Sequence, residues 1–305
     1  MKAVRFDKYG GIDVLNIADI PQPTAGKGQV LVRVEAAGIN PGEAAIREGK
    51  LEQMYHTNFP CGEGADFAGV IDAIGEGVTT FAKGDEVIGF SNDRSSHAEF
   101  LVVPEAQIIL KPATVSWAEG GSLFVAGSTA YAAIKAVKLE KGDTVVISGA
   151  AGGVGSVAVQ LAKHTGAKVI GIAGKANHQW LKDHGTIPVS YGNDMEAEIK
   201  KAAGGKVDAF IDLFGQGYVE LAIRLGIAPE RINTIIDFEA VKKHHVKADG
   251  SAKAATAAVL TELAQLMEKG DLKIPIAKRY PLSEVREAYK EIEQRHTHGK
   301  IVLIP

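Results

Sequence analysis

Cysteine is almost absent from this chain: Cys61 is the single one among 305 residues. One cysteine cannot form an intramolecular disulfide, and it excludes any metal site built from several thiolates. An excess of basic residues is missing too, since 34 Lys and Arg stand against 37 Asp and Glu, for a net charge of −3. This balance predicts no nucleic-acid partner and no anionic membrane surface as partner.

Long apolar runs are also missing. The N-terminal MKAVRFDKYGG lacks the apolar core of a secretory signal, and no stretch is long and apolar enough to predict a membrane span. A composition of 46% hydrophobic and 23% charged residues is typical of a soluble globular protein, and the length predicts two domains. We therefore expect a cytosolic, two-domain protein that is not associated with a membrane.

Residues 144–178 carry the most informative local pattern. Thr144 to Ser148 is a β-branched run closed by Gly149, which predicts a buried parallel strand. Apolar residues then recur at helical spacing over 154–162, and 168–173 forms a second apolar strand. Strand, glycine turn, helix and strand together make a βαβ unit.

The turn of this unit reads Ala150-x-Gly152-x-x-Gly155, which is the dinucleotide fingerprint with alanine in place of the first glycine. Its glycines let the backbone approach a pyrophosphate, which then binds the amides and positive dipole of the helix N-terminus. The pattern predicts a bound dinucleotide. The residues assigned to it here are Ala150, Gly152, Gly153, Val154 and Gly155.

The sequence on either side of residue 123 differs in character. Before it, short alternating runs separated by Gly, Pro and Asp predict a mostly antiparallel β domain. From Thr129 onward, strands alternate with longer helices, which predicts a parallel sheet covered on both faces. Further strands are expected at 187–190, 207–212 and 232–236, an alanine-rich helix at 252–258, and an amphipathic helix over 259–267.

The last part of the chain is expected to return to the first domain, through 272–280, a helix from Ser283 and a strand at 300–304. The predicted division is therefore 1–123 with 270–305 in one domain, and 124–269 in the other.

Six stretches carry a family resemblance: 36–49, 64–90, 126–134, 149–163, 211–215 and 281–305. Together they resemble the medium-chain dehydrogenase/reductases, in the zinc-independent quinone oxidoreductase (zeta-crystallin-like) branch. The resemblance spans nearly the whole chain. It implies an α/β protein with a β-rich GroES-like catalytic domain and a doubly wound Rossmann domain, with the active site in the cleft between them.

Zinc is not expected, because two ligand positions are changed. Zinc-dependent relatives carry a cysteine where Asn40 stands and a histidine where Ala65 stands. Alanine has no lone pair, and a neutral amide is a poor substitute for thiolate. His296 and His298 lie on a polar stretch near the C-terminus and are interpreted as solvated surface.

The resemblance also assigns residues to the reaction site. Asn40 and Pro41 match the family's active-site loop, in which the asparagine lies beside the nicotinamide and the substrate carbonyl; the alternative is a loop asparagine that bonds its own backbone. Thr129 matches a threonine at the nicotinamide end of the cofactor, and it could equally cap a helix. Phe214, in the matching 211–215, is assigned to the cofactor site.

Other matches and departures leave alternatives open. Asp66 and Arg47 match the family but could equally form structural ion pairs. Glu43 stands where relatives often have aspartate, and Ala45 where they often have tyrosine, which leaves the acceptor pocket undefined. Tyr55 is a candidate to supply the hydroxyl, with simple packing as the alternative. No residue is nominated as general acid, since solvent can supply the proton.

The cofactor is expected to be NADPH. NAD-specific units carry an acid about 20 residues beyond the fingerprint, whereas 173–178 reads AGKANH and has none. Gly174 and Lys175 lie there, and Tyr191 matches a tyrosine that relatives place beside the 2′-phosphate. In the alternative interpretation, Lys175 is a solvated surface lysine and Tyr191 a packing residue.

Three functions stay open. The first is an NADPH-dependent reductase of quinones or of other conjugated carbonyls, including alkenals and enones. The second is a zinc-type alcohol dehydrogenase, which the changed ligand positions oppose. The third is a non-enzymatic NADPH-binding structural or regulatory protein. In each case we expect a homodimer that pairs the edges of its parallel sheets near 232–236.

Overall fold

The computed structural model describes all of residues 1–305, and the chain folds into two compact units. Unit 1 comprises residues 1–125, 256–268 and 274–305, and unit 2 comprises residues 126–255 and 269–273. Helix α3 (Leu123–Ala136) passes from the first unit into the second. None of the helices is long and apolar enough to cross a membrane.

Unit 1 is rich in β-structure. A small antiparallel sheet has the order β2-β1-β4. A larger sheet, antiparallel except for the parallel pair β14 and β15, has the order β14-β15-β3-β5-β6-β8, with β7 also paired to β3. The strands are β1 (Lys2–Phe6), β2 (Asn16–Asp19), β3 (Gln29–Gly38), β4 (Cys61–Gly62), β5 (Asp66–Ile74), β6 (Glu86–Phe90), β7 (Phe100–Pro104), β8 (Ile108–Leu110), β14 (Ile276–Pro281) and β15 (Lys300–Ile304). Its helices are α1 (Pro41–Arg47), α2 (Trp117–Gly120), α9 (Ala257–Glu268) and α10 (Val285–Glu293).

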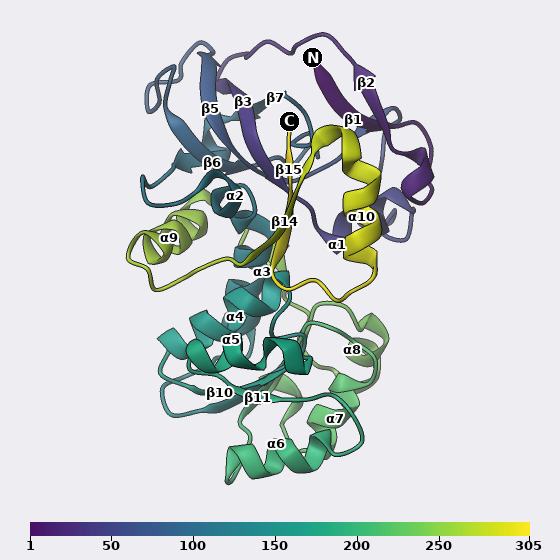
Figure 1. The fold of residues 1–305 in the computed structure, drawn as a ribbon, viewed down its shortest axis with the longest axis vertical. Coiled ribbons are helices and arrows are strands. Elements are labelled where there is room, and N and C mark those ends of the chain that lie inside the picture. Colours follow the sequence, from purple (N-terminus) through teal and green to yellow (C-terminus); the bar gives the residue numbers. More distant parts are fainter. The chain divides into compact units, whose positions relative to one another are not determined.

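The two ends of the chain meet in this unit (Figure 1). Strand β15, drawn in yellow, pairs antiparallel with β3 through Val302 opposite Gly38 and Leu303 opposite Ala37. The ladder extends one step further, because the Ile39 N–H donates to the Ile301 carbonyl at 3.1 Å. Lys300 is thereby brought beside residues 39 and 40.

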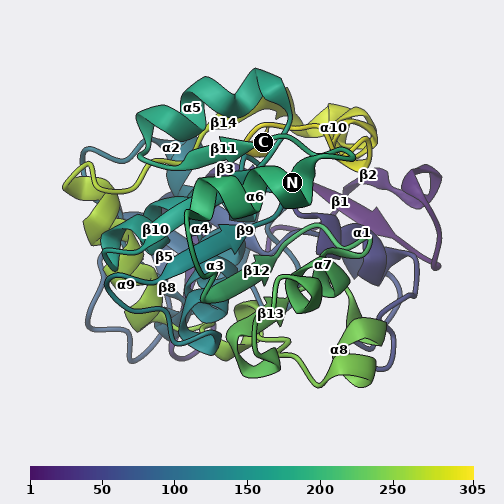
Figure 2. The ribbon, with the colours of Figure 1, turned by 90° about the horizontal axis from the view of Figure 1, so that it is seen from below.

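Unit 2 holds a five-stranded parallel sheet of order β11-β10-β9-β12-β13 (Figure 2). Its elements are β9 (Thr144–Ile147), α4 (Gly153–His164), β10 (Lys168–Ile172), α5 (His178–Asp183), β11 (Ile187–Val189), α6 (Met195–Ala203), β12 (Ala209–Asp212), α7 (Tyr218–Arg224), β13 (Ile232–Thr234) and α8 (Phe238–His244). From β9, the chain adds β10 and β11 on one side of the sheet and then β12 and β13 on the other side. Right-handed crossovers then place helices on both faces, so the predicted Rossmann arrangement is confirmed.

The alanine-rich segment 252–258 is not the continuous helix that its composition predicts. A single 3-10 turn at Ser251–Lys253 ends at Ala254, whose φ of −136° is not helical. Helix α9 begins only after Thr256, whose hydroxyl accepts the Val259 N–H at 3.2 Å. The cap formed by Thr256 and the burial of Ala254 therefore outweigh the helix propensity of alanine. Helix α9 packs against β8 in unit 1, whereas the sequence suggests that it belongs with the Rossmann domain.

One edge of the parallel sheet lies at β13, within the predicted region, and a short segment is bridged to it. Strand β13 is the last named strand, but it ends at Thr234 and its outer side is not open. Thr234 donates its N–H to the Lys247 carbonyl at 3.0 Å, and the Lys247 N–H donates to Ile232 at 2.9 Å. The exposed edge is therefore the segment 246–249.

Candidate active site

In the glycine turn of unit 2, the residue with the left-handed backbone conformation is Gly149, one position before Ala150, where the fingerprint begins. Gly149 has φ +58°, and its carbonyl accepts the Gly152 N–H at 3.0 Å. Ala150 is fully buried and donates its N–H to the Ile172 carbonyl at 3.0 Å. Gly149 therefore makes the tight turn, which explains how alanine is tolerated in place of the first glycine.

The other two glycines serve different purposes. A β-carbon on Gly155 would lie 2.0 Å from the Gly149 carbonyl oxygen, so only glycine allows α4 to pack this closely on the turn. A β-carbon on Gly152, the N-cap of α4, would meet that oxygen at 3.3 Å and nothing else within 4 Å. The first-turn amides of α4 lack intrahelical acceptors, and no acidic side chain lies in that turn. This end of α4 is suited to an anion.

The residues expected to select the cofactor come together at the end of β10. The Tyr191 hydroxyl lies against Gly174, where an added β-carbon would be 3.4 Å from it. Lys175 follows Gly174 directly and is exposed, as is Tyr191. One turn later, His178 turns its Nε2 back to the Ala173 carbonyl at 3.2 Å. This corner presents a cation and a phenol and contains no carboxylate.

Asp212 organises the loops at the carboxyl end of the sheet. One of its carboxylate oxygens accepts the Ser148 hydroxyl at 2.7 Å and the Phe214 and Gly215 N–H groups at 3.0 and 2.9 Å. The other accepts the Thr234 hydroxyl at 2.8 Å. The sequence gives one signal for this role, an aspartate directly after a buried apolar strand, and that signal is insufficient to identify the partners. Through these bonds Asp212 holds the backbone of Phe214.

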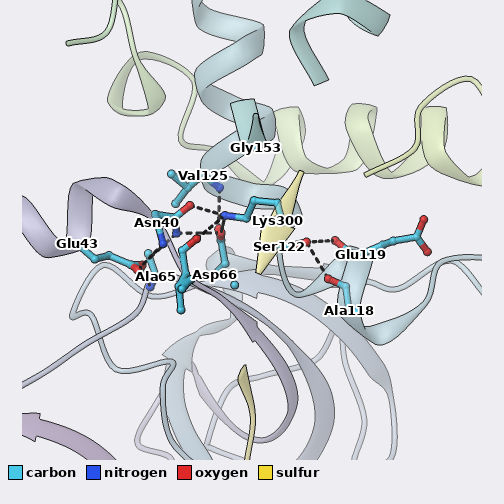
Figure 3. A network of polar contacts seen from close by, with 12 residues as sticks. Asn40, Glu43, Ala65, Asp66, Ala118, Glu119, Ser122, Val125, Gly153 and Lys300 are labelled. Carbon is cyan, nitrogen blue, oxygen red and sulfur yellow. Dashed lines mark hydrogen bonds and ion pairs between the residues drawn. The ribbon is translucent and has the colours of Figure 1, made fainter. Parts of the chain in front are cut away.

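In unit 1, Asn40 lies inside a buried polar network (Figure 3). Its side-chain Nδ2 donates to Glu43 and to Asp66, each at 3.1 Å, and its Oδ1 accepts from the Lys300 ammonium. Lys300 also donates to the Ile39 carbonyl at 3.0 Å and to Asp66 at 3.3 Å. The Asn40 side chain therefore joins α1 to β5 and β15.

Glu43 is the second centre of this network. Its carboxylate accepts from the Asn40 N–H at 2.8 Å, the Ala65 N–H at 3.0 Å and the Tyr289 hydroxyl at 2.8 Å, besides the Asn40 side chain. Asp66 accepts the Val125 N–H at 2.7 Å, and burial raises the pKa of Asp66 against the opposing effect of Lys300. Asp66 thus has a structural ion-pair partner.

A further buried ion pair lies behind α1. Arg47 is fully buried, donates to Glu63 at 2.6 Å and stacks its guanidinium 4.6 Å from the centre of the Tyr289 ring. Burial raises the pKa of Glu63 from 4.5 to about 8, although Arg47 opposes the shift. Removal of the Glu63 carboxyl from water is therefore the stronger of the two effects on its pKa.

His97 lies beside the same ring and stays neutral. Its Nε2 faces the Gly38 carbonyl at 3.2 Å, so that nitrogen carries the hydrogen. Burial lowers the pKa of His97. The charge balance around Tyr289 is thus set by carboxylates, lysine and arginine alone.

Glu63 is expected to make stability depend on pH. Because its folded pKa lies above its unfolded value, the folded state keeps a proton that the unfolded chain has released, and the free energy of unfolding falls as pH rises from 4.5 to about 8. The slope is up to about 1.4 kcal/mol per pH unit. Urea denaturation at pH 5.5, 6.5 and 7.5 measures it. Glu63→Gln should flatten the profile relative to the wild type, and parallel profiles would contradict the assignment.

The remaining predicted residues are Pro41, Tyr55 and Thr129. Pro41 is exposed at the first position of α1, and Tyr55 lies in the loop after α1 with 43% of its surface exposed. Thr129 is buried in α3, in unit 2. His296 is exposed, and no group of three or more His, Cys, Asp and Glu side chains is arranged to hold a metal ion.

Two family models match the chain. The alcohol dehydrogenase GroES-like domain matches residues 26–113, and the zinc-binding dehydrogenase model matches residues 124–303. Over 99% of its length the chain is 30% identical to a quinone oxidoreductase of Rattus norvegicus, covering 96% of that protein.

Solved structures agree with this. The quinone oxidoreductase of Coxiella burnetii superposes with a TM-score of 0.88 at 33% identity, covering 100% of this chain and 99% of that one. The Escherichia coli quinone oxidoreductase complexed with NADPH shares the fold, with a TM-score of 0.85 at 23% identity and full coverage of both chains. With its GroES-like and Rossmann-type sheets and these relatives, the chain belongs to the quinone oxidoreductase group of the medium-chain dehydrogenase/reductases and is an oxidoreductase of that family.

Proposed function

We propose that this protein is an NADPH-dependent reductase that transfers hydride to quinones or to other conjugated carbonyls without zinc. The observation that carries the proposal is the open turn at the N-terminus of α4, accompanied in the same unit by Lys175 and Tyr191 with no carboxylate between 173 and 178. Quinones and enones share an electron-poor carbon that accepts hydride. The relatives named quinone oxidoreductase support this acceptor class.

The residues of unit 2 fit a dinucleotide phosphate. The amides of Gly153, Val154 and Gly155 would hold the pyrophosphate, and Lys175 with the Tyr191 hydroxyl would hold a 2′-phosphate. We assign Thr129 and Phe214 to the same cofactor. When bound, reduced nicotinamide supplies the hydride, and the chain's contribution is to orient the cofactor and keep water away. The E. coli relative was solved with NADPH, which agrees with this choice.

The residues of unit 1 do not fit a catalytic zinc. Ala65 offers no ligand atom, and Asn40 already has its Nδ2 bonded to two carboxylates and its Oδ1 bonded to Lys300. Asp66, one of the two carboxylates bonded to Asn40, is paired with the same ammonium. A divalent cation here would have to displace Lys300 and would still lack nitrogen or sulfur ligands.

The test is a screen of NADPH oxidation with 1,4-benzoquinone, 2-alkenals and enones, on protein dialysed against a strong chelator and checked by elemental analysis. We expect turnover with a quinone in the metal-free protein. Activity with alkenals or enones alone would favour the reductase alternative. Tight NADPH binding without oxidation of any acceptor would favour the non-enzymatic alternative, and activity that disappears with stoichiometric zinc would contradict the proposal.

Replacing Lys175 should separate the two cofactors. A hydrogen bond to a charged group contributes about 1.5–3 kcal/mol, and exposure of Lys175 places its effect near the lower end, about tenfold in affinity. Lys175→Ala should raise the KM for NADPH by about this factor and leave the KM for NADH nearly unchanged, because NADH has no 2′-phosphate. Equal losses with both cofactors would assign Lys175 to the fold or to the shared part of the nucleotide. Lys182→Ala, on α5, is the matched control.

We also propose a homodimer formed at the edge of the parallel sheet. Next to β13, Ile236 and Phe238 leave 43% and 46% of their surface exposed, and the segment 246–249 lies along the same edge. Contact with a second copy would cover these side chains. Light scattering at micromolar concentration should give twice 32.2 kDa, and Phe238→Glu should shift the mass toward the monomer. A monomer mass for the wild type would overturn the proposal.

A further inference from the structure

The Asn40 side chain has one allowed orientation, although its oxygen and nitrogen are alike in shape. Oδ1 accepts from the Lys300 ammonium, while Nδ2 donates to the carboxylates of Glu43 and Asp66 (Figure 3). A flip would bring the amide NH2 against the ammonium and its oxygen against two carboxylates. Charged neighbours on both sides therefore determine which way the amide points.

Lys300 contributes the cationic side of this arrangement. Its side chain is 4% exposed, and its three N–H groups are all used, by the Ile39 carbonyl, by Asn40 and by Asp66. The backbone pairing of β15 with β3 brings it to Asn40, as described above. Lys300 has no N–H left for a substrate, so any effect that it has on a ligand passes through Asn40.

The orientation limits what Asn40 can offer to a ligand. Both Nδ2 hydrogens are donated within the protein, and Oδ1 keeps one lone pair beyond the bond from Lys300. A carbonyl oxygen needs a donor, so Asn40 cannot donate to the substrate carbonyl beside which the family resemblance places it. The group that it can bind is itself a donor, such as the carboxamide N–H of a nicotinamide or the hydroxyl of a reduced acceptor.

We propose that Lys300 is a positioning residue, which fixes the Asn40 side chain as a hydrogen-bond acceptor for a donor group of a bound ligand. The identity of the ligand that Asn40 binds rests on the proposed function. The orientation of the Asn40 amide does not depend on that function. The two parts can therefore be tested separately.

The informative variant is the double replacement Lys300→Met with Asp66→Asn. Lys300→Met alone leaves the Asp66 carboxylate buried without a cation, and we expect that protein to be severely destabilised. The double variant removes both charges, and the amide oxygen introduced at position 66 can still accept the Val125 N–H. The new NH2 cannot accept from the Asn40 Nδ2, so Asp66→Asn alone is compared with the double variant, and the difference reports Lys300. Lys290→Met, at an exposed position of α10 in the same unit, is the matched control.

The first readout is hydrogen exchange of the Asn40 side-chain NH2, followed by NMR without ligand. Protection is expected in the wild type and in Lys290→Met, and exchange at least about tenfold faster in the double variant. An Asn40 NH2 that exchanges in the wild type as fast as an exposed amide would overturn the proposal without any variant. So would unchanged protection in the folded double variant.

The second readout is kinetic. The double variant should lose about 10- to 100-fold in kcat, because the reacting groups are no longer held in place, and its Kd for NADPH should rise only where the donor group that Asn40 binds is the nicotinamide carboxamide. A wild-type kcat in a folded double variant would overturn the proposal. A wild type that reduces no acceptor would overturn the proposed function instead, and the exchange measurement would still decide whether Lys300 orients Asn40.

Discussion

Gly155→Ala is expected to destabilise unit 2 by at least about 3 kcal/mol, which is a large fraction of the stability of a small domain, about 5–15 kcal/mol. The new methyl group would lie 2.0 Å from the Gly149 carbonyl oxygen and 2.8 Å from the backbone of Ala150. Both obstacles are backbone, so no side chain can move aside. Helix propensity predicts the opposite sign, since alanine in place of glycine inside a helix is worth about 1 kcal/mol. Urea denaturation followed by circular dichroism separates the two expectations.

Two glycines of the same unit provide the comparison. Gly152→Val adds a branched side chain where space is open, so it should cost about 1 kcal/mol in stability, mostly through the poorer N-cap, and weaken NADPH binding about 100-fold or more. Gly205→Ala meets nothing within 4 Å and should change neither quantity. Full NADPH affinity in Gly152→Val would show that the phosphate site is wrongly placed. A stable Gly155→Ala would show that α4 does not depend on close packing.

Asp212→Ala should lower the free energy of unfolding by about 4 kcal/mol or more. The replacement leaves two hydroxyls and two backbone N–H groups without their acceptor in a fully buried place, and each unsatisfied group costs about 1–3 kcal/mol. The loop that carries Phe214 should also loosen, so NADPH affinity is expected to fall together with stability. Chemical denaturation and fluorescence titration measure the two effects.

Asp212→Asn distinguishes the hydrogen-bond network from simple loss of bulk. Its carbonyl oxygen can replace the carboxylate oxygen that accepts three donors, and only the bond from the Thr234 hydroxyl must be rearranged. The cost should therefore be about 1–2 kcal/mol. Asp208→Ala, which removes one backbone acceptor and one exposed lysine contact at the other end of the strand, is the control. Equal losses for Asp212→Asn and Asp212→Ala would argue against the network.

Much of unit 2 could be predicted from the sequence, because its signals are local. The β-branched run at 144–148, the glycine turn and the helical spacing after it lie within one segment, and their period alone distinguishes strand from helix. The missing acid between 173 and 178 is equally local. The C-terminal strand was also recognisable from its own composition, at 300–304.

The partners of the buried charges could be decided only by the tertiary structure. Lys300 and Asn40 are 260 residues apart in the chain, and Tyr289 and Glu43 are 246 apart, so no spacing rule connects them. In the sequence without the structure, Glu43 is only a departure from the family pattern, and Tyr289 is only one residue of an amphipathic helix. Tertiary contacts also overruled local preference at Ala254 and moved the left-handed turn residue to Gly149. Local periodicity determines which helices and strands form. Which charged side chains form a site is determined by their desolvation, which acts only after distant segments have packed together.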